Sequence, residues 1–232
     1  MEVLGIKQIS PDNLILWQWG FLKVNATIAY TWFIMLALLL LSWTATRRLP
    51  PESPISRWQL LLEIILEEVR AQIAAVSRQD DPRRYLDFIA TLFLFILAAN
   101  LLAFVPGYVP PTASLSTTTA LAVCVFFAVP LYGISARGFR DYLGHYIRPS
   151  TVMLPFNILG EISRTLALAF RLFGNILSGA KITAILLVVI PFFAPVLLDI
   201  LGILIGVIQA YIFAMLATIY IASASQARGE GE

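Results

Sequence analysis

The residues most able to do chemistry form a polar stripe in an otherwise apolar segment near residue 170. They recur at steps of mostly three or four residues, which places them on one helix face: Asn157, Gly160, Glu161, Arg164, Ala167, Arg171, Asn175, Ser178 and Gly179. An arginine near mid-bilayer costs at least about 2.5–3.5 kcal/mol on insertion scales, so such a residue faces protein or water and typically marks an ion or substrate path. Arg164 has Glu161 three residues earlier, whereas no carboxylate lies within one turn of Arg171. The partner of Arg171 is therefore expected outside its own helix.

A second polar stripe follows in the next apolar segment. Its members also fall mostly at steps of three and four: Asp199, Gly202, Gly206, Gln209, Phe213 and Tyr220. Two such stripes facing each other would make a polar seam between two helices.

Each of these residues also has a plainer interpretation. Asn175 and Gln209 are amides of the kind that bridge helices by hydrogen bonds, and Gly202 with Gly206 matches a packing pattern of small residues. Glu161 and Arg164 form either a local ion pair or part of a channel lining. Asp199 is either an interfacial residue near a helix start, where negative charge suits the helix dipole, or a channel residue.

Composition places these stripes in a membrane protein. The chain has 232 residues, of which 59% are hydrophobic and 13% charged, and its mean hydropathy is +0.83. These values lie outside the range of soluble domains. A net charge of +2 gives no basic field for a nucleic-acid partner, and the single cysteine, Cys124, excludes an intrachain disulfide. Nothing in the sequence calls for a cofactor or a metal.

Hydropathy predicts an all-α integral membrane protein with five spans in a single domain covering residues 1–232. The predicted elements are an external N-terminus at 1–23, spans at 24–46, 85–105 and 117–135, and a helical hairpin at 152–226 whose two arms meet at the turn 191–195. Residues 55–77 form an amphipathic helix that should lie along the membrane. Its polar face is partly acidic, so docking on another protein element is at least as well supported as lipid binding.

The basic residues set the orientation, because cytoplasmic loops are enriched in Lys and Arg. All arginines between spans fall on one side under this plan: Arg47, Arg48, Arg57, Arg70, Arg78, Arg83 and Arg84 after the first span, Arg137, Arg140 and Arg148 after the third, and Arg228 in the tail. The N-terminus, with Lys7 and Lys23, is then external and the C-terminus cytoplasmic.

The fourth span is too long for an upright helix. The residues between Pro155 and Pro191 would extend roughly 53 Å at about 1.5 Å per residue, whereas the hydrocarbon core is about 30 Å thick. A steeply tilted hairpin fits this length best.

Two motifs give the stripes a family resemblance. The run 163–179, with Arg171-Leu172-Phe173-Gly174-Asn175 at its centre, closely resembles the signature of subunit a of F-type rotary ATP synthases, and 206–213, with Gln209-Ala210 and Ile212-Phe213, resembles the matching final-helix motif. The strong resemblance covers residues 151–226, and the five-span plan extends a weaker one over most of the chain.

The resemblance implies a non-catalytic stator subunit in the membrane sector of the complex, multi-pass in a bacterial inner membrane. Its partners would be the c-subunit ring, the b-type peripheral stalk, the rest of the ATP synthase and membrane lipid. Arg171 matches the family's essential arginine, which separates two aqueous half-channels and so couples ion flow to rotation and to ATP synthesis or hydrolysis. Asn175 and Gln209 match polar positions near it, and Ser178 lies in the same signature.

The sequence departs from the commonest family pattern at Ala180, where many members have a carboxylate, and at Gly202, where some have histidine. Asp199 is the leading substitute in the outer half-channel, and Glu161 suits the cytoplasmic one. These departures resemble the bacterial N-type branch, for which sodium transport has been proposed. Whether this chain carries protons or sodium stays open, because the rotor carboxylate lies on another chain.

Two rival functions remain to be weighed. A secondary ion or anion transporter would also explain a buried arginine, but no internal repeat is evident. An intramembrane hydrolase would need a His-Glu-x-x-His motif or a histidine within a span, and the sequence has neither.

Overall fold

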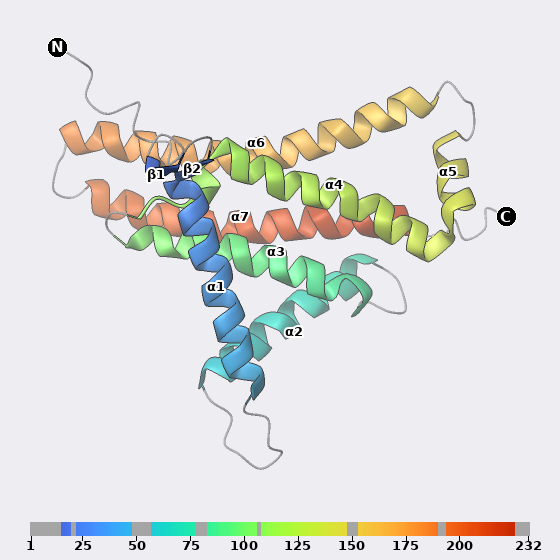
Figure 1. The fold of residues 1–232 in the computed structure, drawn as a ribbon, viewed down its shortest axis with the longest axis horizontal. Coiled ribbons are helices and arrows are strands. Elements are labelled where there is room, and N and C mark those ends of the chain that lie inside the picture. The colour runs from blue at the N-terminus through green and yellow to red at the C-terminus, as the bar shows by residue number, and fades with distance from the viewer. Residues whose placement is uncertain are drawn as a thin grey trace.

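The computed structural model describes residues 15–19, 22–47, 57–77, 83–105, 108–147, 153–189 and 194–225. Within these ranges the chain forms two short strands and a series of helices (Figure 1). In chain order they are β1 (Ile15–Trp19), β2 (Leu22–Asn25), α1 (Ala26–Arg47), α2 (Arg57–Ser77), α3 (Arg83–Leu101), η3 (Leu102–Phe104), η4 (Pro111–Ala113), α4 (Leu115–Arg137), α5 (Phe139–Ile147), α6 (Met153–Val189) and α7 (Ala194–Ser225).

Five described helices are long and apolar enough to cross a membrane. These segments are Ala26–Thr44, Arg84–Phe104, Leu115–Arg137, Leu154–Leu186 and Val196–Ser225. They confirm the predicted all-α membrane class with five long apolar helices, and the placement of each span in the membrane stays a prediction. The predicted termini at 1–14 and beyond 225, and the turn at 190–193, lie outside the described residues.

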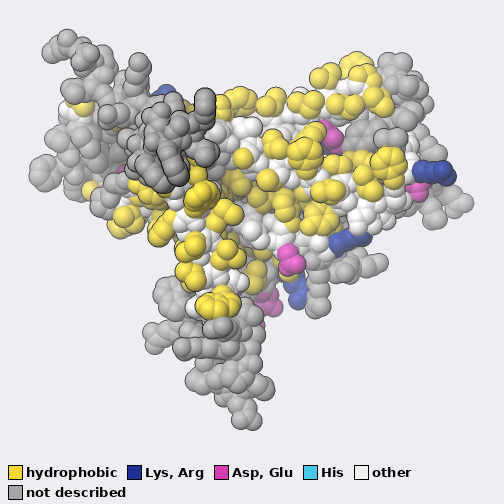
Figure 2. Space-filling model, viewed as in Figure 1, with side chains coloured by type: hydrophobic (Ala, Val, Ile, Leu, Met, Phe, Trp, Pro, Cys, Tyr) yellow, Lys and Arg dark blue, Asp and Glu magenta, His cyan; other side chains and the backbone are white. Residues whose placement is uncertain are grey.

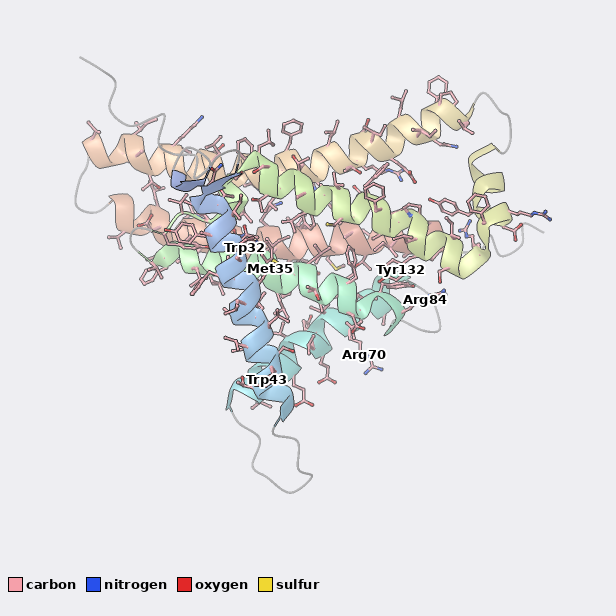
Figure 3. The ribbon with its side chains drawn as sticks, in the orientation of Figure 1. Trp32, Met35, Trp43, Arg70, Arg84 and Tyr132 are labelled. Atoms are coloured by element: carbon pink, nitrogen blue, oxygen red, sulfur yellow. The ribbon has the colours of Figure 1, made fainter. Side chains whose placement is uncertain are left out.

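Two short strands lie at the N-terminal end of the described chain. Strands β1 and β2 pair antiparallel, with Trp19 opposite Leu22, and β2 leads directly into α1. Helix α1 runs across the direction of the long helices (Figure 1) and leaves most of its apolar side chains exposed. Trp32, Met35 and Trp43 lie along its length in Figure 3 and are all more than half exposed. A helix with so little protein contact has its apolar surface available to lipid.

Helix α2 is the predicted amphipathic segment, and it packs on the other helices. Its contacts are with α3 and α7, to which it turns the buried Ile73 and the half-buried Val69. The Tyr211 hydroxyl of α7 donates to Gln72 Oε1 at 3.2 Å, and Gln72 Nε2 donates to Glu68 Oε1 at 2.9 Å. The structure therefore favours docking on protein for the apolar face of this helix.

Helices α3, α4, α6 and α7 pack side by side in one bundle, with α7 in contact with the other three (Figure 1). The buried face of α7 is made largely of small residues, including Ala210, Ala214 and Ala217, with Phe213 and Ile221 between them. Small residues let helix backbones approach closely in a membrane, where van der Waals packing drives association. α7 is thus the central helix of the bundle.

The two longest helices, α6 and α7, are each continuous and pack against one another. α6 has 37 residues and α7 has 32, so α6 extends about 56 Å at 1.5 Å per residue. Pro155 falls in the first turn of α6, where a missing N–H costs little. Neither helix fits upright within a hydrocarbon core of about 30 Å, so the steep tilt remains the prediction for this hairpin.

The short helix α5, between the third and fourth predicted spans, closes one end of the bundle. Gly138 ends α4 with φ of 85°, a backbone conformation that favours glycine, and α5 starts directly after it. Tyr142 of α5 packs its ring against Gly133, where a Cβ would lie 2.5 Å from Tyr142 Cε2. α5 is therefore locked to α4 at the end where α6 begins (Figure 1).

Hydrophobic side chains predominate among the described side chains on the face in Figure 2, and the charged ones are few and scattered. Arg84 of α3 and Tyr132 of α4 lie near each other in Figure 3, and Arg84 Nη2 donates to the carbonyl and the hydroxyl of Ser135 at 2.5 Å each. Arg137 Nη2 donates to the Ser223 carbonyl of α7 at 3.4 Å. These arginines tie α3, α4 and α7 together at one end.

Candidate functional site

Arg171 lies on the outer side of α6, away from the bundle. Leu168 and Leu172 on the same turn are buried in the core, whereas the Arg171 side chain is exposed. No hydrogen bond or ion pair joins it to any of the residues that the structure describes. The helix thus presents a bare guanidinium from a segment apolar enough to span a membrane.

The surface around Arg171 is apolar or made of small residues. Phe170 is 56% exposed, and Ala167, one turn before Arg171, is exposed as well. Ser178 and Gly179, two further members of the predicted stripe, are also exposed on α6. We call the outward surface formed by Ala167, Phe170, Arg171 and Ser178, all of them exposed, the outer face of α6. A charge set in such a surface needs a partner that excludes lipid from it.

Asn175 and Gln209, two of the predicted site residues, are joined by a hydrogen bond between the two stripes. Asn175 Nδ2 on α6 donates to Gln209 Oε1 on α7 at 2.5 Å. Gln209 is only 3% exposed, so its amide is fixed by the bundle. Asn175 stands one helical turn after Arg171, and the bond ties that part of α6 to α7.

Arg164 contacts α7 through an aromatic ring. Its guanidinium carbon lies 5.7 Å from the centroid of the Tyr220 ring, a distance at which a cation is attracted to the π face. Arg164, for which Glu161 was one predicted local partner, thus stacks on Tyr220 of the second stripe. The predicted seam between the two stripes forms at these two pairs, and Arg171 and Ser178 lie outside it.

Glu161 and Arg164 line a cavity of about 380 Å³ at the end of the bundle closed by α5. Polar groups from three helices reach it, including Asn157, Tyr142 and Ser223, and its apolar wall comes from α4. The Glu161 side chain is half-buried. The cavity is large enough for several water molecules and has the polar groups that hold water.

Asp199 lies at the other end of the hairpin. It is exposed, in the second turn of α7, and Gly202 one turn later is exposed too. Since α6 begins beside α5 and α7 begins at the opposite end (Figure 1), Glu161 and Asp199 mark opposite ends of the pair. The side chain of Ala180, the other point of departure from the family pattern, is not among the described ones.

Sequence reasoning missed a buried polar group on α3. Asn100 is 3% exposed, and its Nδ2 donates to the Gly206 carbonyl of α7 at 2.9 Å. Its Oδ1 accepts from the Thr112 hydroxyl at 2.8 Å. The available signal was a single amide in the apolar run 92–102, because a polar side chain in a span is costly unless it is bonded.

Comparison with known proteins agrees with this architecture. The family model described as ATP synthase A chain matches residues 28–222. A protein named ATP synthase subunit a from Nitrosospira multiformis is 56% identical over 222 residues, which cover 96% of this chain and 88% of that protein. ATP synthase subunit a 1 from Chlorobaculum parvum is 57% identical, with 95% and 97% covered, and ATP synthase subunit a 2 from Acaryochloris marina is 56% identical, with 94% and 93% covered.

Proposed function

Because this chain belongs to the ATP synthase subunit a family, we propose that Arg171 is the stationary charge past which an ion-binding carboxylate of the rotor moves. The chain is a subunit of the membrane sector of that complex, so the carboxylate would be supplied by a c subunit. Ion flow through the contact then turns the rotor and is coupled to ATP synthesis or hydrolysis.

The observation that carries this proposal is the exposure of Arg171. The guanidinium has no partner among the described residues of its own chain, and it sits in an apolar outer face. Leaving a charge unpaired at membrane depth is costly, so a counter-charge from another subunit is the simplest way to satisfy it. A carboxylate is the natural partner because guanidinium binds it through two parallel N–H···O bonds.

Arginine suits a contact that must attract a carboxylate without taking its proton. The guanidinium stays charged at any accessible pH and cannot serve as a proton relay. A rotor site approaching Arg171 must give up its ion to become a carboxylate, and it reloads after passing. The arginine therefore separates loading from release.

Two routes to the contact are needed, one from each side of the membrane. The cavity lined by Glu161 and Arg164 supports a route at the α5 end, and the exposed Asp199 supports one at the opposite end. We assign the first to the cytoplasmic side and the second to the external side, following the positions of the arginine-rich loops. Asn175 and Gln209 would orient the α6 turn that carries the arginine, and Ser178 would extend the face that the rotor covers.

The same proposal fixes the partners and the setting. The outer face of α6 would meet the c-subunit ring, the exposed helices would meet lipid and the b-type stalk, and the complex would lie in a bacterial inner membrane with the C-terminus in the cytoplasm. The transported ion is H⁺ or Na⁺, chosen by the rotor site. A lone secondary transporter is not favoured, since the relatives carry the name of a subunit.

The test is Arg171→Lys in the assembled complex. Lysine keeps the charge as a compact ammonium and loses the planar fork that holds a carboxylate. ATP-driven ion pumping by inverted vesicles should fall at least about 100-fold, equivalent to about 2.7 kcal/mol of barrier. The matched control is Arg70→Lys on α2, an exposed arginine outside the hairpin, which should pump normally. Normal pumping by Arg171→Lys would overturn the mechanism.

A further inference from the structure

A buried polar network joins three separate segments next to the candidate site. The side-chain amide of Asn100 on α3 donates to the Gly206 carbonyl of α7, and its carbonyl oxygen accepts from the Thr112 hydroxyl of η4. Asn100 is 3% exposed and Thr112 is 0% exposed. The network is therefore shielded from solvent, and both functional groups of the amide are satisfied within it.

Residue 206 has to be glycine for this contact to form. A Cβ built on it would lie 2.8 Å from Cβ of Asn100, closer than side chains tolerate. The Gly206 carbonyl can accept the amide because a carbonyl oxygen has two lone pairs, and a helix bond uses one of them. The bond fixes both the height and the rotation of α7 relative to α3, since a shift of either would separate the donor from its acceptor.

The network lies one helical turn from Gln209, which is hydrogen-bonded to Asn175 beside the turn of α6 that carries Arg171. Gln209 follows Gly206 by three positions and so lies on the same side of α7. Gln209 in turn accepts from Asn175 of α6, and Asn175 follows Arg171 by four positions. Hydrogen bonds thus run from η4 through α3 and α7 to α6.

We propose that Asn100 is a positioning residue that holds α7 at the height where Gln209 meets Asn175, and so sets the depth of Arg171 in the outer face of α6. Asn100 acts through Gly206 and does not touch the ion or the rotor. The effect on pumping rests on the proposed function, whereas the effect on the position of α7 does not.

A matched pair of threonines tests the network first. Thr112→Val removes the hydroxyl that holds Asn100, and Thr218→Val removes a hydroxyl that is equally buried but bonds only to Ala214 O of its own helix. Pumping per assembled complex should fall about three- to tenfold in Thr112→Val and stay near wild type in Thr218→Val. Equal effects of the two substitutions would overturn the proposal.

The second test uses the shape of the asparagine. A protonated Asp at position 100 can donate to Gly206 O and accept from Thr112, while an ionised one cannot donate. Burial favours the neutral acid, so pumping by Asn100→Asp relative to wild type should be retained at low pH and lost at high pH, where the acid can ionise and no longer donates. Asn100→Leu should be about tenfold slow at every pH.

The neighbouring tyrosine will not obscure that profile. Burial, with a smaller contribution from Tyr30, raises the pKa of the Tyr108 hydroxyl, which donates to Ala99 O at 3.3 Å. It stays neutral over the range assayed. A pH-independent loss in Asn100→Asp would indicate a packing role only and would overturn the positioning role.

A distance measurement separates this inference from the proposed function. Cys124 of α4, the chain's single cysteine, is exposed, and Ile219→Cys adds a second exposed labelling site on α7. In complexes whose other cysteines are replaced, the spin-label distance should shift or broaden in Asn100→Leu and not in Thr218→Val. An unchanged distribution in Asn100→Leu would refute the inference, whatever the outcome for Arg171→Lys.

Discussion

The polar groups on the two arms of the hairpin, α6 and α7, differ in burial and in hydrogen bonding. On α7, Gln209 is buried, and the Gly206 carbonyl beside it is bonded by a buried asparagine. On α6, Arg171 is exposed and unpaired within the described chain. The inner arm is fixed by satisfied hydrogen bonds, while the outer arm offers a charge to something else. A rigid inner helix and an available outer charge are what a stationary contact against a moving partner requires.

The largest effect is expected from a substitution at the close contact between α7 and α3. Gly206→Ala forces a Cβ to 2.8 Å from Asn100, and overpacking of this kind typically costs about 1–3 kcal/mol. Pumping per complex should fall about tenfold, and the amount of assembled complex should fall in heat-challenge assays. Gly202→Ala is the matched control, because nothing lies within 4 Å of a Cβ there. If both variants behave alike, the close contact of α7 with α3 does not affect pumping.

The contrast can be sharpened at the bond that links the two arms. Gln209→Leu leaves Asn175 without its acceptor and puts an apolar side chain in the same buried position. Losing such a bond costs about 0.5–1.5 kcal/mol, so pumping should fall about three- to tenfold while assembly is retained. Measuring both quantities in the same vesicles checks this. Normal pumping would confine the pair to packing.

The smallest effects are expected at Glu161 and Asp199, the carboxylates at opposite ends of the α6–α7 hairpin. Asp199→Asn should slow transport more than Glu161→Gln if Asp199 replaces the carboxylate missing at position 180. The expected difference is about two- to fivefold, less than 1 kcal/mol, and initial pumping rates would reveal it. Equal and negligible changes would remove both residues from the ion path.

Much of this architecture follows from pattern alone. The all-α class with five long apolar helices was predicted from hydropathy, and the structure confirms it. Helix α2 lies where the amphipathic pattern was found. The lack of a local partner for Arg171 could be read from the residues three and four positions away, because helix geometry is local. Facing stripes were also predicted, and among the described residues Asn175 meets Gln209 and Arg164 meets Tyr220.

What the sequence did not reveal depends on contacts between distant segments. Asn100 and Gly206 are 106 positions apart, and no spacing rule links them. The hairpin of β1 and β2 is short, and helix α5 has only nine residues, so neither gives a strong periodic signal. Their positions come from packing against α1 and α4.

The most direct test of the account asks what covers the outer face of α6. Ala167→Cys and Phe170→Cys, in a Cys124→Ser background, would be treated with a photoactivatable thiol reagent in the assembled complex. Both positions are exposed and should cross-link to the c subunit. Met35→Cys, equally apolar and exposed on α1, should not. Cross-links from α1 as strong as those from α6, or none from α6, would contradict the claim that Arg171 faces the rotor.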